Sequence, residues 1–295
     1  MAELCLNGLG VALVTPFKKD LTIDYQALEK LVEYVISGGC DYIVALGTNA
    51  ETPTLSSEEK DKVARFISQQ VGQRIPLVIG IGGNNTMGVI REIQSRDLSG
   101  YNAILSVTPY YNKPTQEGLF QHYKAISEAS PLPILLYNVP GRTGVNMTAD
   151  TTLRLARLSK NICGIKEASG KLDQCEKIIN NAPDHFSLVS GDDSATCGLM
   201  QLGAKGLISV LANAFPKETK KLVDLSKISN NPEAFSYQKS LEPLISHLFE
   251  DGNPAGVKAA LANLGLLENV LRLPLVPVSK AVEEKLNTRI SELFA

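Results

Sequence analysis

The segment Pro133-Ile-Leu-Leu-Tyr-Asn-Val139 is followed, after an intervening segment, by Ile162-Cys-Gly-Ile-Lys-Glu-Ala168. Both are short and nearly continuous in apolar residues, rather than alternating apolar with polar ones. Strands that are buried on both faces of a parallel sheet have this composition. The pair therefore predicts two parallel strands joined by a helix, which is the repeating unit of α/β proteins.

Apolar runs of this kind recur along the chain. Counting the first two, there are eight, at residues 10–15, 41–47, 76–82, 103–109, 133–139, 162–168, 186–191 and 206–211. Eight alternations of strand and helix are typical of a (β/α)8 TIM barrel. A doubly wound open sheet is the alternative. That fold usually has Gly-x-Gly-x-x-Gly after its first strand, whereas Thr15-Pro16-Phe17 stands there in this chain.

The segments between the runs have helical patterns. Leu28, Leu31, Val32 and Val35 fall on one face of a helix. Ser56 and Glu59 have the spacing of a capping box, which predicts a helix N-terminus at Ser56. Thr148 and Ser194 are predicted to cap later helices with their hydroxyl groups.

The eight runs end near residue 211, and the helix after the last one ends near residue 228. Beyond it, residues 232–250, 254–268 and 279–292 look helical, and no comparable strand run follows. We therefore expect a barrel that carries the active site in residues 1–229. Residues 230–295 are expected to form a C-terminal helical extension.

Composition excludes several classes of protein. The chain has 295 residues, of which 44% are hydrophobic and 20% charged, enough to bury a large core. The net charge of −2 and the absence of a basic stripe argue against a nucleic-acid partner. The chain has no run of 18 or more apolar residues, so no membrane span is predicted. The first ten residues lack the pattern of a signal peptide.

Cysteines and histidines give no sign of a disulfide framework or a metal site. The five cysteines are widely spaced and none forms Cys-x-x-Cys, and the three histidines lie far apart. We expect no metal and a reducing, cytoplasmic setting.

Active sites of TIM barrels lie at the C-terminal ends of the strands, so polar residues near those ends are candidates for chemistry. Lys166 is the most informative of them. A lysine inside an apolar parallel strand must bury its ammonium or point into a cavity, and unpaired burial favours loss of the proton. The neutral amine is a nucleophile that forms Schiff bases with carbonyls. A structural ion pair with Glu167 is the alternative, although neighbouring strand residues face opposite ways.

Other polar residues stand at the ends of predicted strands. Tyr137 could relay protons or be a core aromatic, and Thr48 could act or cap the next helix. Tyr111 could act or stack at an interface. Arg142 offers a bidentate fork for a carboxylate or is a surface residue. The adjacent pair Asp192-Asp193 is more typical of a helix N-terminus than of a metal site.

Together these residues resemble the dihydrodipicolinate synthase / N-acetylneuraminate lyase family of pyruvate-dependent class I aldolases. The resemblance extends from Gly8 to Pro277. Four motifs carry it most strongly, and they occur in the order of the family: Val107-Thr-Pro-Tyr-Tyr-Asn-Lys-Pro114, Tyr137-Asn-Val-Pro-Gly-Arg-Thr-Gly144, Gly164-Ile-Lys-Glu-Ala-Ser-Gly170 and Ser190-Gly-Asp-Asp193.

The resemblance implies roles for the site residues. Lys166 would form an imine with pyruvate, and Tyr137, Thr48 and Tyr111 would relay protons, with Tyr111 reaching in from a neighbouring subunit. Arg142 would bind the carboxylate of L-aspartate 4-semialdehyde. The carboxylate of pyruvate would lie on backbone amides near Thr48 and Asn49, in a pocket lined by Gly191 and Ile208.

The implied reaction gives 4-hydroxy-tetrahydrodipicolinate, in the diaminopimelate route to lysine. The lysine imine makes a metal or organic cofactor unnecessary, and members are commonly homotetramers built as dimers of dimers. Two alternatives stay open. One is another pyruvate-dependent class I aldolase, of the N-acetylneuraminate lyase or 2-keto-3-deoxy sugar acid aldolase type. The other is a catalytically silent homologue.

Two departures from the family pattern matter. The usual Gly-Thr-Thr-Gly-Glu after the second strand is here Gly47-Thr-Asn-Ala-Glu51, so Asn49 replaces a threonine that contacts substrate. We expect activity to persist, with altered pyruvate affinity or donor choice. At the positions where lysine-inhibited members carry a His and a Glu, this chain has Lys60 and Gly88, which predicts weak or absent inhibition by lysine.

Overall fold

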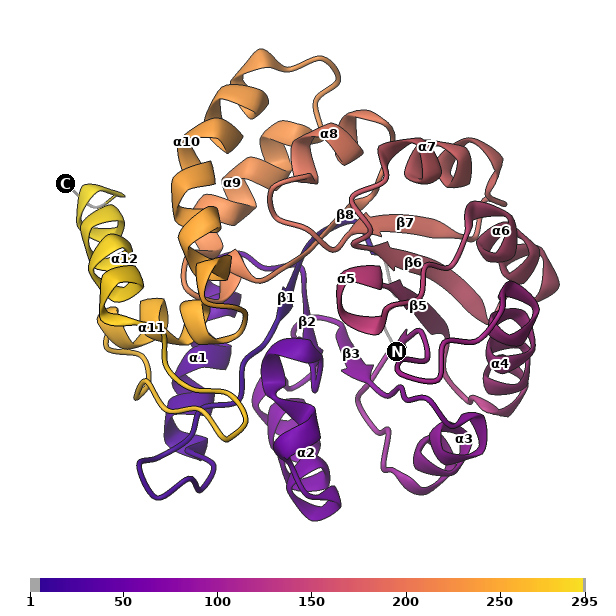
Figure 1. Cartoon of the computed structure of the whole chain (residues 1–295), viewed down its shortest axis with the longest axis horizontal. Coiled ribbons are helices and arrows are strands. Elements are labelled where there is room, and N and C mark those ends of the chain that lie inside the picture. Colours follow the sequence, from indigo (N-terminus) through magenta and orange to yellow (C-terminus); the bar gives the residue numbers. More distant parts are fainter. Residues whose placement is uncertain (1–5, 294–295) are drawn as a thin grey trace.

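The computed structural model describes residues 6–293 and contains a closed barrel of eight parallel strands (Figure 1). Each strand pairs with the next one in sequence, and β8 closes the sheet by pairing with β1. The prediction of a TIM barrel is therefore confirmed, and the open sheet is excluded. The strands are β1 (Gly8–Ala12), β2 (Tyr42–Ala45), β3 (Leu77–Gly80), β4 (Ala103–Val107), β5 (Ile134–Asn138), β6 (Ile162–Glu167), β7 (Ser187–Ser190) and β8 (Gly206–Ser209).

Helices surround the barrel and continue beyond it. The four predicted apolar positions of α1, at Leu28, Leu31, Val32 and Val35, are all buried. The helices are α1 (Tyr25–Ser37), α2 (Ser57–Val71), α3 (Thr86–Ser95), α4 (Gln116–Ala129), α5 (Pro140–Thr143), α6 (Ala149–Leu158), α7 (Leu172–Asn181), α8 (Thr196–Gln201), α9 (Pro216–Ser226), α10 (Pro232–Glu250), α11 (Ala255–Asn263) and α12 (Lys280–Leu293). Three short 3-10 helices accompany them: η1 (Thr48–Ala50), η2 (Thr52–Thr54) and η3 (Leu211–Asn213).

Two of the three predicted helix caps are confirmed. Ser56 and Glu59 form a capping box on α2, and the Thr148 side chain caps α6. The prediction for Ser194 is wrong, because α8 begins at Thr196 without a side-chain cap. The Ser194 hydroxyl donates instead to Glu242 on α10.

Strand register places the side chains that matter. Tyr137 on β5 lies opposite Lys166 on β6, and the next pair is Asn138 opposite Glu167. Because side chains alternate along a strand, the first pair faces the barrel interior and the second faces the surrounding helices. The interior itself is filled by an apolar cluster that includes Tyr137, Val189 and Ile208.

The helices α10, α11 and α12 pack on one another along one side of the barrel, as the orange-to-yellow segment of Figure 1 shows. Helix α10 also packs against α8 and α9. The boundary between residues 229 and 230 stays a prediction. Within residues 6–293 no helix combines the length and hydrophobicity needed to cross a bilayer.

Candidate active site

A cavity of about 590 Å³ opens at the C-terminal ends of the strands. Its wall brings together most of the residues that the sequence singled out: Thr48, Asn49, Tyr137, Arg142, Lys166 and Gly191. They come from the ends of β2, β5, β6 and β7 or from the loops that follow these strands. This is the end of a TIM barrel at which active sites lie.

Lys166 is buried, with 4% of its surface exposed, and its amine faces the cavity. Its Nζ lies 4.4 Å from the ring centroid of Tyr137. No ion pair of Lys166 occurs among residues 6–293, so the alternative of a structural pair with Glu167 is wrong. The Glu167 carboxylate faces the helices and accepts from Asn138 Nδ2, Ser169 N and Gln174 Nε2, while burial raises its pKa.

Gly191 gives the lysine side chain its space. A Cβ atom on Gly191 would lie 2.9 Å from Cε of Lys166, closer than two carbon atoms normally approach. Ile208 is fully buried in the interior cluster with Tyr137 and Val189. The residue of this segment that lines the cavity is Val210.

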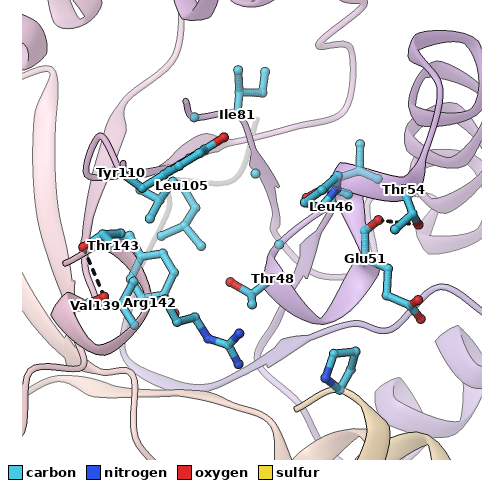
Figure 2. Close-up of a pocket in the computed structure, with 18 of the residues that line it drawn as sticks. Leu46, Thr48, Glu51, Thr54, Ile81, Leu105, Tyr110, Val139, Arg142 and Thr143 are labelled. Atoms are coloured by element: carbon cyan, nitrogen blue, oxygen red, sulfur yellow. Dashed lines mark hydrogen bonds between the residues drawn. The ribbon is translucent and has the colours of Figure 1, made fainter. Parts of the chain in front are cut away.

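A second cavity of about 380 Å³ adjoins the first. The two share wall residues, which are Thr48, Tyr137, Val139, Arg142 and Asn253. Figure 2 shows Thr48 and Arg142 extending toward this second cavity from opposite sides, with Tyr110 on a further side. Thr48 and Arg142 therefore stand where the two cavities adjoin, and Lys166 lines the first cavity alone.

Tyr111, like Ile208, is a predicted site residue that the structure does not place in the wall of this cavity. It is 90% exposed, has a positive φ of 72° and lines neither cavity of its own chain. Its neighbour Tyr110 lines the second cavity.

Asn49 and Asn253 form a bridge across the cavity wall. The Nδ2 of Asn253 donates to Oδ1 of Asn49 over 2.7 Å, and Nδ2 of Asn49 donates to the carbonyl oxygen of Ala12 over 2.8 Å. The backbone oxygen of Asn253 accepts from Nη2 of Arg142 over 3.1 Å. Sequence reasoning missed Asn253, because it follows α10 in the extension and carries no local motif.

A buried ion pair lies behind the loop that carries Thr48. Lys258 on α11 and Glu51 are both fully buried, and Nζ of Lys258 lies 2.5 Å from Oε1 of Glu51. Burial outweighs the attraction of Glu51 and lowers the pKa of Lys258 to about 8. Sequence reasoning missed this pair too. A single lysine in the apolar segment Ala255-Gly-Val-Lys-Ala-Ala-Leu261 is nevertheless the kind of signal that identified Lys166.

Asp193 has a structural role. Its carboxylate accepts from Oγ of Ser209 and from the backbone N–H groups of Val210 and Leu211, and burial raises its pKa. In the part of the chain that the structure describes, no three His, Cys, Asp or Glu side chains gather as metal ligands.

The family comparison decides the assignment. The model of the dihydrodipicolinate synthetase family matches residues 5–293. The chain belongs to this family. Curated members include the 4-hydroxy-tetrahydrodipicolinate synthases of Parabacteroides distasonis and Phocaeicola vulgatus, each 52% identical to this chain over 99% of both chains.

Solved structures of the dihydrodipicolinate synthetase family agree with this fold. A dihydrodipicolinate synthase from Acinetobacter baumannii, solved in complex with pyruvate, is 43% identical and superposes with a TM-score of 0.94 over 98% of this chain and 99% of its own. The Thermotoga maritima enzyme is 41% identical, with a TM-score of 0.94 over 97% of this chain and 98% of its own.

Proposed function

We propose that this protein condenses pyruvate with L-aspartate 4-semialdehyde, through an imine on Lys166, to give 4-hydroxy-tetrahydrodipicolinate for the diaminopimelate route to lysine. The environment of Lys166 carries the proposal. A primary amine without a carboxylate partner among residues 6–293 faces a cavity of about 590 Å³, beside a phenol, and an arginine lines the same cavity. The names of the curated relatives support the choice of substrates.

The chemistry balances without a metal or organic cofactor. The amine of Lys166 adds to the keto carbon of pyruvate and water leaves, which forms the imine. Loss of a methyl proton gives an enamine, whose carbon attacks the aldehyde of the second substrate. The amine of that substrate then attacks the imine carbon, closes the ring and releases Lys166, so that the sum of the steps loses one water.

Proton transfers are assigned to Tyr137, Thr48 and Tyr111. Tyr137 lies against the reacting amine, and Thr48 stands where the two cavities meet, so both are close to the atoms that gain and lose protons. Tyr111 completes the relay in the cavity of a neighbouring subunit of a homotetramer. Its 90% exposure within one chain supports this assignment.

Substrate binding is divided between the two sides of the cavity. The backbone amides near Thr48 and Asn49 hold the carboxylate of pyruvate. The guanidinium of Arg142 holds the carboxylate of the aldehyde, since its planar fork matches a carboxylate. Gly191 gives the imine its space, which its close approach to Lys166 supports, and Ile208 supports the pocket from the interior cluster in which it packs with Tyr137.

Borohydride trapping tests the proposal. The protein is incubated with pyruvate, reduced, and analysed by intact mass and peptide mapping. A single reduced pyruvyl adduct on Lys166, absent from Lys166→Ala, is expected. Lys258 is an internal control, because it is also buried but is paired with Glu51. No adduct, or an adduct on another lysine, would overturn the proposal.

The acceptor is tested with the same protein. Pyruvate consumption is expected with aspartate 4-semialdehyde, and little with N-acetylmannosamine or glyceraldehyde. The reverse preference would assign the chain to a sugar acid aldolase instead.

The role of Tyr111 has its own test. Lys166→Ala and Tyr111→Phe are each expected to be nearly inactive alone. Mixed and reassembled, they should regain activity in hybrid oligomers, because one chain supplies the lysine and the other the tyrosine. No recovery in demonstrated hybrids would contradict a tyrosine shared between subunits.

A further inference from the structure

The side chain of Asn49 joins three segments that are far apart in the sequence. It is 1% exposed and bonds to the end of β1 at Ala12 and to Asn253, which follows α10. Its Oδ1 and its Nδ2 are therefore both engaged by the protein. A direct contact of this amide with pyruvate would have to compete with these bonds.

Asn253 depends on that contact for its orientation. It is 9% exposed, and its Oδ1 is a buried oxygen that has no hydrogen-bond partner among residues 6–293. Within that part of the chain, the bond from Nδ2 to Asn49 is the one hydrogen bond that orients its side chain. Removal of the Asn49 amide would leave the whole Asn253 amide without a partner, which is unfavourable for a buried polar group.

Arg142 is held from the other side of Asn253. Its Nη2 donates to the backbone oxygen of Asn253 over 3.1 Å, and the guanidinium has no carboxylate partner in the described part of the chain. Arg142 lies on the short helix α5, and its side chain lines both cavities. A long side chain with one such anchor moves when the anchor moves.

We infer that Asn49 is a positioning residue for Arg142, acting through Asn253, and that it sets the affinity for the acceptor aldehyde rather than for pyruvate. The inference rests on the proposed function, since it takes Arg142 as the residue that binds the acceptor's carboxylate. It differs from the expectation drawn from the sequence, in which a change at position 49 alters the use of pyruvate.

Steady-state kinetics of Asn49→Leu and Asn253→Leu test the inference, because leucine is close to asparagine in size but makes no hydrogen bond. Each variant is expected to raise KM for aspartate 4-semialdehyde about tenfold, the effect of losing one hydrogen bond of ordinary strength. KM for pyruvate and the rate of borohydride trapping should stay within twofold of the parent protein. The double variant should be no worse than the single ones, because all three break the same bridge.

Asn263→Leu is the matched control. The Nδ2 of Asn263 donates to Oδ1 of Asn287 over 2.7 Å, so an amide pair of equal length joins α11 to α12, away from both cavities. Neither KM should change in this variant. If Asn49→Leu does not fold, Asn253→Leu removes the same bond from the other partner and makes the test.

The outcomes separate the inference from the function on which it rests. Raised KM for pyruvate or slowed trapping, with KM for the aldehyde unchanged, would overturn the inference. Asn49 would then be assigned to pyruvate binding, as the sequence led us to expect. Additive effects of the two substitutions would also overturn it. Absence of any pyruvyl adduct in the parent protein would instead overturn the proposed function.

Discussion

Replacing Gly191 with alanine should slow imine formation without unfolding the protein. The added methyl group would lie 2.9 Å from Cε and 3.0 Å from Cγ of Lys166, and 3.0 Å from Cβ of Ala168. Carbon atoms in favourable contact are about 3.5–4.0 Å apart, so the lysine side chain has to move by about 0.5–1 Å. The overlap falls mainly on a flexible side chain, which can rotate away while the backbone stays in place.

A shift of about 1 Å in a reacting group can lower a rate about 100-fold. We therefore expect Gly191→Ala to slow the borohydride-trapped reaction with pyruvate by about 10- to 100-fold. The loss of unfolding free energy in urea should stay within the roughly 1–3 kcal/mol that is typical of an overpacked site.

Gly198→Ala is the control for this substitution. Gly198 lies in α8, and a Cβ atom there would meet nothing within 4 Å. This variant should trap pyruvate at the parental rate. If Gly191→Ala also trapped pyruvate within twofold of the parental rate, the argument that this glycine clears the path of Lys166 would be refuted.

Three further predictions concern stability and regulation. Lys258→Met leaves the buried carboxylate of Glu51 unpaired and is expected to lower the unfolding free energy by about 3–5 kcal/mol in urea, and Glu51→Gln in the same chain should restore most of it. His122 is 5% exposed and burial lowers its pKa to about 4, so below pH 6.5 the unfolded chain binds a proton that the folded chain does not. Stability should therefore fall by up to about 3 kcal/mol from pH 6.5 to 4, and less in His122→Phe; equal slopes in the two proteins would contradict this. Lysine should inhibit weakly, because its ammonium would face Lys60 and would lack the carboxylate that Gly88 replaces, and half-maximal inhibition at submillimolar lysine would refute this.

The barrel could be predicted because its strands are buried on both faces. Seven of the eight apolar runs contain a strand of the structure and the first run overlaps one, since continuous burial leaves a continuous run of apolar residues. The ends of the strands were predicted less accurately. The first strand begins at Gly8 rather than at Gly10, because apolar composition does not distinguish the last residues of a strand from the adjoining loop. The predicted cap at Ser194 failed because its hydroxyl binds a helix 48 residues away.

The candidate site could be predicted in part, for a related reason. Lys166 stands out because a charged residue interrupts an apolar strand. Tyr137 lies near the end of the neighbouring strand β5, and Thr48 directly follows the end of β2. Asn253 could not be found in this way, because its importance comes from a bond to Asn49, 204 residues earlier. Contacts of such separation leave no local pattern in a single sequence.

The ion pair between Glu51 and Lys258 has a consequence for the growing chain on the ribosome. Its two members are separated by 207 residues, so the acid is synthesised long before the base. Until Lys258 has emerged from the ribosome, the nascent chain must leave the carboxylate of Glu51 in water or bury it unpaired. Unpaired burial of a charge is strongly unfavourable. The turn that presents Thr48 should therefore be among the last parts of the barrel to reach its final conformation, since it has to wait for Lys258 to be synthesised and to fold onto Glu51.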